Sequence, residues 1–181
     1  EITEALSRGW TVVAIDYRLI PAVLLKDIVE DAQDAYEWVR TNLSKIEPIN
    51  PDIISVFGRS AGGSLALISG YKFTPQPKAI IALFPYLSNF NDPFVSNHMT
   101  PPSEELLAAM REINQTITQA STKRSSPRSH VFEKMLLEKK QGWVLVSRDP
   151  NESAESIEAK LREFSAVDHV DKNYPPTYLA H

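Results

Sequence analysis

The most constraining feature of the sequence is an apolar run that passes through a glycine-serine motif into a run of small residues. Residues 53–57 are rich in β-branched and aromatic side chains, and residues 60–69 are mostly small. The residues at the junction are Gly58, Arg59, Ser60, Ala61, Gly62 and Gly63. This order predicts a buried strand, a sharp turn and then a helix, which is the setting of a nucleophilic serine.

Each residue type around Ser60 has a physical reason in such a turn. The turn strains the serine backbone, so Gly58 and Gly62 are expected to let strand and helix approach closely. Ala61 and Gly63 keep the corner uncrowded. The helix begins at the serine, so the Ala61 N–H is expected to stabilise negative charge on a substrate oxygen. The alternative is that Ser60 only caps the helix. The strand before it and the helix after it favour a nucleophile.

The rest of the chain predicts an α/β fold with a mainly parallel sheet, helices on both faces and a helical cap between the last two strands. Strands are expected at 11–15, 53–57, 79–84 and 176–180, and core helices at 1–8, 27–43 and 60–69. We expect residues 1–88 to form the core, 89–173 the cap and 174–181 a returning core strand. Cap helices are expected near 103–119, 129–140 and 152–164. Residues 143–146 are either a short strand or part of the cap core.

Composition excludes several classes of function. The 181 residues carry a net charge of −4 and contain no cysteine. The charge gives no reason to expect a nucleic-acid partner, and we expect none. No apolar run reaches the ~20 residues of a membrane span. We expect no metal and no cofactor, because no residue pair has metal-ligand spacing on one helix. The absence of cysteine and of a visible signal peptide favours a cytoplasmic location, and the oligomeric state stays open.

Several segments resemble the hormone-sensitive-lipase-like esterases, the fold-3 group of α/β hydrolases. The resemblance lies in the apolar run from Gly9 with the turn residues that follow it, in residues 29–32, in the junction at Ser60 and in residues 174–177. It implies an esterase that forms an acyl-enzyme at Ser60, with a small-molecule ester as its partner. It also implies that Asp16 and Arg18 are structural, either as a buried ion pair or as a capped turn.

The same resemblance implies that the other catalytic groups lie outside the chain. The family places its acid and histidine after the nucleophile, beyond His181, and its His-Gly-Gly loop before Glu1. The abrupt ends suggest an excerpt from a longer protein. Residues that we do not expect to complete a triad are His98, His130, His169, His181 and Asp149. The chain alone is therefore expected to be inactive. The alternatives are a non-catalytic binding protein of this fold, or a related serine peptidase or amidase.

Overall fold

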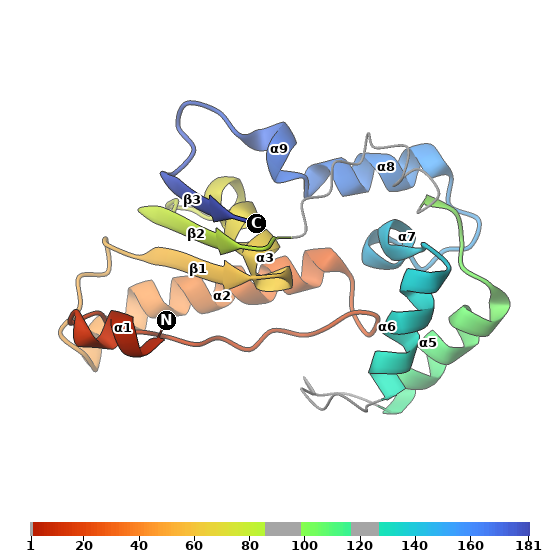
Figure 1. The fold of residues 1–181 in the computed structure, drawn as a ribbon, viewed down its shortest axis with the longest axis horizontal. Helices are drawn as coiled ribbons and strands as arrows, with labels where there is room; N and C mark the ends of the chain where they lie inside the picture. Colours follow the sequence, from red (N-terminus) through yellow and green to blue (C-terminus); the bar gives the residue numbers. More distant parts are fainter. Residues whose placement is uncertain (1, 86–98, 117–126) are drawn as a thin grey trace.

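A three-stranded parallel sheet forms the centre of the fold, here in a computed structural model that describes residues 2–85, 99–116 and 127–181 (Figure 1). The strands lie in the order β1-β2-β3. They are β1 (Ser55–Arg59), β2 (Ala79–Leu83) and β3 (Thr177–Ala180). All three carboxyl ends meet at one edge, since both pairings are parallel. Ligand sites of open α/β sheets lie at this edge.

Two helices pack against the sheet. They are α2 (Leu25–Asn42) and α3 (Ala61–Lys72), and a short 3-10 helix, η1 (Leu43–Lys45), follows α2. Helix α3 buries Ala66 and Leu67 against Ile80 and Ala82 of β2. These strand residues alternate, as expected for one face of a sheet. The apolar stripe of α2 contributes a second buried cluster beside it, made of Ala32, Tyr36 and Phe73.

The strand expected at 11–15 is wrong, because this segment pairs with no described strand. It follows α1 (Ile2–Ser7) and runs extended, but Val12, Val13 and Ile15 remain 38–42% exposed. A cavity of about 810 Å³ has this segment and β1 among its lining residues. A β-branched run favours extended backbone, but a strand also needs a neighbour for its N–H and C=O groups.

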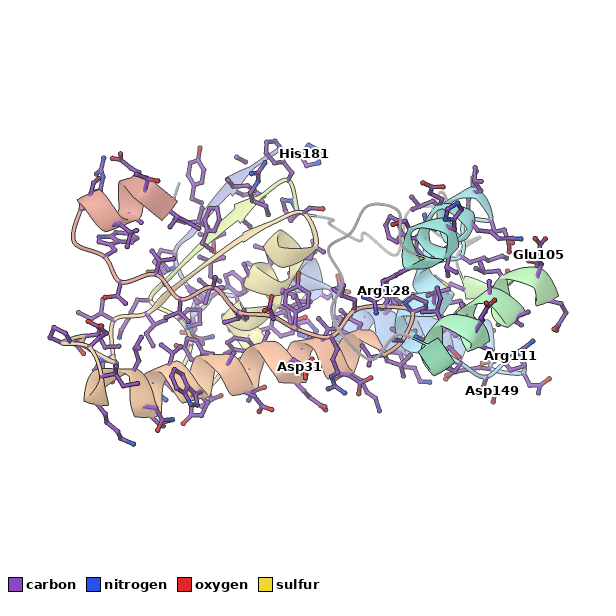
Figure 2. The ribbon with its side chains drawn as sticks, turned by 90° about the horizontal axis from the view of Figure 1, so that it is seen from below. Asp31, Glu105, Arg111, Arg128, Asp149 and His181 are labelled. Atoms are coloured by element: carbon purple, nitrogen blue, oxygen red, sulfur yellow. The ribbon has the colours of Figure 1, made fainter. Side chains whose placement is uncertain are left out.

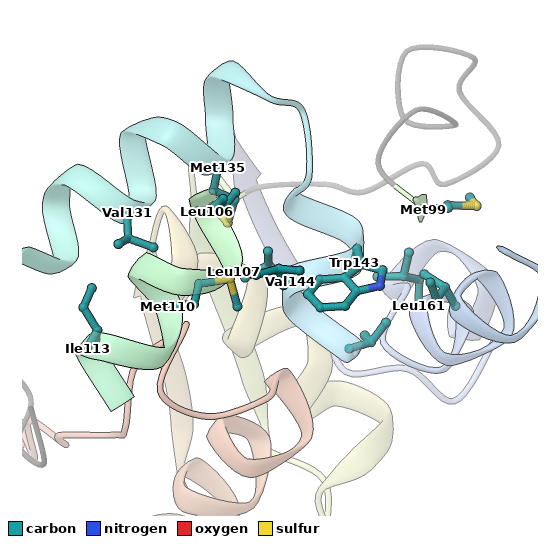
Figure 3. Close-up of a cluster of buried hydrophobic side chains, with 12 residues drawn as sticks. Met99, Leu106, Leu107, Met110, Ile113, Val131, Met135, Trp143, Val144 and Leu161 are labelled. Carbon is teal, nitrogen blue, oxygen red and sulfur yellow. The ribbon is translucent and has the colours of Figure 1, made fainter. Parts of the chain in front are cut away.

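A group of helices lies beyond the carboxyl ends of the strands (Figure 1). They are α5 (Glu104–Thr116), α6 (Pro127–Leu137), α7 (Gln141–Val146), α8 (Ala154–Glu163) and α9 (Ala166–His169). Twelve buried residues, Met99 and eleven from α5, α6, α7 and α8, make a separate core (Figure 3): Met99, Leu106, Leu107, Met110, Ile113, Val131, Met135, Trp143, Val144, Val146, Ile157 and Leu161. Residues 143–146 are thus helical and not a strand. A short apolar run does not distinguish the two, and burial of Trp143 and Val144 on neighbouring helices decided it.

The helical group is tied to the sheet region by partly buried hydrogen bonds of Arg148. The Arg148 guanidinium donates to the carbonyl oxygens of Pro21 and Val23 at 2.7 and 2.8 Å. Burial lowers the pKa of Arg148 to about 10. The division into core and cap at residues 88 and 173 stays a prediction. In the described ranges, no helix is both long and apolar enough to span a membrane.

Candidate functional site

Ser60 stands at the turn from β1 into α3, with an exposed side chain. Its backbone has φ 51° and ψ −121°, a conformation that costs a non-glycine residue about 1–3 kcal/mol. Two backbone bonds hold the turn. The Ser60 N–H donates to Leu83 O at 2.9 Å, and the Ser64 N–H donates to Ser60 O at 3.1 Å. The Ser60 hydroxyl bonds no group in the described parts of the chain and does not cap α3. This geometry favours a nucleophile over a helix cap.

The glycines around Ser60 differ in what they make possible. A Cβ at Gly58 would lie 1.9 Å from the Gly62 carbonyl oxygen, so only glycine allows the strand to approach the helix here. A Cβ at Gly63 would lie 3.1 Å from Leu83 O. At Gly62 the nearest described atom is the Tyr17 hydroxyl, 4.0 Å away, so a side chain would fit there. The close approach of strand and helix, which we expected to need both Gly58 and Gly62, therefore needs a glycine at Gly58 and leaves room for a side chain at Gly62.

Ala61 and Tyr17 offer hydrogen-bond donors beside the serine. Ala61 is the first residue of α3, so its N–H has no acceptor within the helix and lies at the positive end of the helix dipole. Tyr17 is half-buried, and burial raises the pKa of its phenol above the ordinary value. The Tyr17 hydroxyl therefore keeps its proton at neutral pH, close to Gly62.

Ser60 and Ala61 line a cavity of about 280 Å³ between the sheet edge and the helical group. Most of its wall is apolar. The helical group contributes Phe132, Met135, Leu136, Leu145, Phe164, Ala166 and Val167, and the sheet side contributes Leu19, Ile20, Leu25, Ile28, Leu65, Leu67 and Ile68. The polar side chains in the wall are Tyr17, Ser60, Ser64 and Gln141. The cavity suits an apolar group of a ligand that reaches Ser60.

No described histidine or carboxylate hydrogen-bonds the Ser60 hydroxyl. His169 ends α9, where its ring stacks on Tyr71 at 4.2 Å between centroids and Nε2 lies 3.2 Å from Arg162 O. His181 follows β3 at the carboxyl edge of the sheet, far from Asp149 (Figure 2). His130 is exposed on α6. His98 lies outside the described residues.

Asp149 and the turn residues Asp16 and Arg18 also make no hydrogen bond to Ser60 in the described parts of the chain. Asp149 accepts from the Asn151 N–H at 2.9 Å, within the turn that its sequence predicted. Arg18 pairs with Asp31 of α2 and not with Asp16, through bonds of 2.8 and 2.9 Å. The pair is not buried, since the Arg18 side chain is 52% exposed. The Arg18 hydrogen bonds hold the pKa of the Asp31 carboxyl below its ordinary value. The sequence did not reveal Asp31 as the partner of Arg18, because the two residues are thirteen positions apart.

Across the ranges that the structure describes, no three His, Cys, Asp or Glu residues gather so that they could hold an ion.

Comparison with known proteins finds several relatives of this chain. The chain is similar to the non-reducing polyketide synthase ascC of Acremonium egyptiacum, with 31% identity over 95% of this chain and 8% of the synthase. It is also similar to the non-reducing polyketide synthase mapC' of Penicillium brevicompactum, with 36% identity over 53% of this chain and 5% of that protein. The chain thus spans less than a tenth of either synthase.

A third relative is a smaller protein. Carboxylesterase/phospholipase LipF of Mycobacterium tuberculosis is 38% identical over 42% of this chain and 20% of its own length. No solved structure matches significantly. A family model described as alpha/beta hydrolase fold matches residues 3–155. The resemblance and the fold class predicted from the sequence are therefore confirmed, and the chain belongs to the α/β-hydrolase fold family.

Proposed function

We propose that the chain carries the nucleophile of a serine hydrolase that acts on carboxylic esters, with Ser60 as that nucleophile. The observation that carries the proposal is the unbonded Ser60 hydroxyl at a strained strand-to-helix turn, in the wall of an apolar cavity. The similarity to a carboxylesterase supports ester chemistry.

The proposed reaction has two steps. Ser60 Oγ attacks the ester carbonyl carbon while a base takes its proton, and the base gives that proton to the departing alkoxide, which leaves as the alcohol and gives an acyl-enzyme. Water then adds to the acyl carbon, releases the acid and restores the serine hydroxyl. In both steps the carbonyl oxygen gains negative charge. The Ala61 N–H would stabilise it, and one such donor contributes about 10²–10³ in rate in another serine hydrolase.

No described residue hydrogen-bonds the Ser60 hydroxyl as a base would. Loss of the base in another serine hydrolase lowers turnover by about 10⁶. We propose that residues 1–181 alone turn over esters very slowly, although Ser60 remains competent to accept an acyl group.

Chemical rescue tests both statements. A p-nitrophenyl ester is incubated with the chain, with and without imidazole, and Ser60→Ala is the matched control. Imidazole is expected to supply the missing base, so hydrolysis above the rate in protein-free imidazole buffer depends on Ser60 and an acyl group is found on its peptide by mass spectrometry. Rescue of equal size in Ser60→Ala, with no acylated peptide, contradicts a nucleophilic Ser60 and favours a non-catalytic binding protein. Rapid turnover without imidazole contradicts only the proposed lack of a base.

A second candidate is that the acyl group is a polyketide. The match to a non-reducing polyketide synthase over 95% of this chain favours it. Rescue rates with an aromatic β-keto acyl ester and with a simple acyl ester of the same alcohol separate the two candidates. The same assay with an amide of the same acid tests the peptidase and amidase alternatives.

A further inference from the structure

One buried polar atom of a residue that lines the apolar cavity has no partner in the described structure. Gln141 Oε1 is fully buried and accepts no hydrogen bond from any described residue. The side chain of Gln141 lines the same cavity as Ser60. A buried acceptor without a donor destabilises a folded chain, because it loses its hydrogen bonds to water and gains none in return.

The fold does not explain this glutamine. Gln141 is the first residue of α7, and the residue before it provides no side-chain cap. Its neighbours in the cavity wall include Met135 and Leu145, which are apolar. A leucine of similar size would pack there without an unsatisfied oxygen. Of the other buried groups without a partner, those of Arg40 and Trp143 do not line this cavity.

The other polar side chains of the cavity wall lie on the Ser60 side and not beside Gln141. Ser64 and Tyr17 lie on the Ser60 side, where the Ser64 hydroxyl is 3.5 Å from Ser60 O and the Tyr17 hydroxyl lies beside Gly62. Gln141 belongs to the helical group on the other side of the cavity, on α7. A ligand that fills the cavity from Ser60 therefore meets the Gln141 side chain in a wall of the helical group that is otherwise apolar, and the buried Oε1 has to turn toward the ligand to accept a hydrogen bond from it.

We propose that Gln141 determines specificity, by accepting a hydrogen bond from a hydroxyl or N–H on the acyl group of the substrate. The substrate class is then an apolar acyl group that carries one such donor, such as a hydroxyaryl acid. A site that hydrogen-bonds a substrate donor rejects the analogue that lacks it, because the site's own group is left unpaired. The inference rests on the proposed function for the position of the acyl group, but it is tested by binding alone.

The experiment measures dissociation constants for matched ligands by calorimetry on the 181-residue chain and on Gln141→Leu. The ligands are ethyl phenylacetate and its 2-, 3- and 4-hydroxy and methoxy derivatives. One hydroxy isomer is expected to bind wild type about fivefold to tenfold more tightly than the parent ester, as for one net hydrogen bond. The methoxy compounds, which cannot donate, should show no such gain. In Gln141→Leu the preference should vanish, and the parent ester should bind at least as tightly as in wild type.

Thermal unfolding without ligand gives an independent measurement. Gln141→Leu is expected to raise the melting temperature, because it removes the unsatisfied oxygen. The matched control is Gln76→Leu, which should lower it, because the Gln76 amide donates to Gly70 O at 2.7 Å. Equal affinity for hydroxy and parent esters in wild type overturns the inference, as does a preference that survives in Gln141→Leu. A lower melting temperature for Gln141→Leu also contradicts it, because the amide would then support the fold.

These outcomes separate this inference from the proposed nucleophile. A hydroxyl preference that depends on Gln141 supports the inference even if imidazole fails to rescue hydrolysis through Ser60. Rescue through Ser60 without any hydroxyl preference supports the nucleophile and contradicts the inference.

Discussion

Gly58 is the position where one methyl group should disturb the site most. In the structure a Cβ at Gly58 would lie 1.9 Å from the Gly62 carbonyl oxygen and 2.7 Å from the Gly63 nitrogen. Both are backbone atoms, so no side-chain rotation relieves the overlap. Gly58→Ala must therefore move β1 away from the start of α3, and Ser60 lies between them.

The magnitude follows from the cost of overpacking. Added methyl groups in packed cores destabilise proteins by about 1–3 kcal/mol. In a chain of this size that lowers the melting temperature by about 2–12 °C. Gly62→Ala is the matched control, because it adds the same atom four residues on, where the nearest described atom is 4.0 Å away. Gly62 is helical, so alanine there should instead stabilise α3 by about 0.5–1 kcal/mol.

The assay is thermal and urea unfolding of the two variants beside wild type, followed by circular dichroism. The expected result has opposite signs, with Gly58→Ala less stable and Gly62→Ala slightly more stable than wild type. Imidazole-rescued acylation of Ser60 should also fall in Gly58→Ala. Two variants of equal stability would refute the assignment of the close contact to Gly58.

Three further predictions concern strain, charge and the link between the helical group and the sheet region. Ser60→Gly should stabilise the chain by about 1 kcal/mol, because glycine adopts φ 51° without strain, whereas Ser60→Ala should not; urea unfolding distinguishes them. Bonds from Lys160, Ser147 and Ser156 lower the pKa of Glu152 from 4.5 to about 2. The ionised Glu152 carboxylate therefore stabilises the fold fully above about pH 4.5, and this stabilisation is lost as the pH falls to 2. The unfolding free energy of Glu152→Gln should therefore depend less on pH over this window than that of wild type, as measured by unfolding curves. Arg148→Met should lower the unfolding free energy measured in urea by about 2–3 kcal/mol, because the carbonyls of Pro21 and Val23 lose their donors; an unchanged value would mean that water replaces the guanidinium.

The sequence predicted those elements whose structure follows from the spacing of their own apolar residues. The apolar spacing along α2, the junction at Ser60 and the strands β1 and β2 were all predictable, because side chains three and four residues apart share a helix face and buried strands read as apolar runs. The residue types at the junction also predicted a serine at the carboxyl edge of the sheet.

Contacts between distant segments decided the rest. The run at 11–15 has the composition of a strand but pairs with no described strand, and residues 143–146 became a helix through burial among other helices. Arg18 took Asp31 as its partner, and the unsatisfied oxygen of Gln141 became visible only when α7 was placed against the cavity. Residue order determined which elements could form and where the serine would stand. Which groups surround that serine depends on segments far apart in the chain, because burial, pairing and an unmet hydrogen bond are properties of the packed molecule.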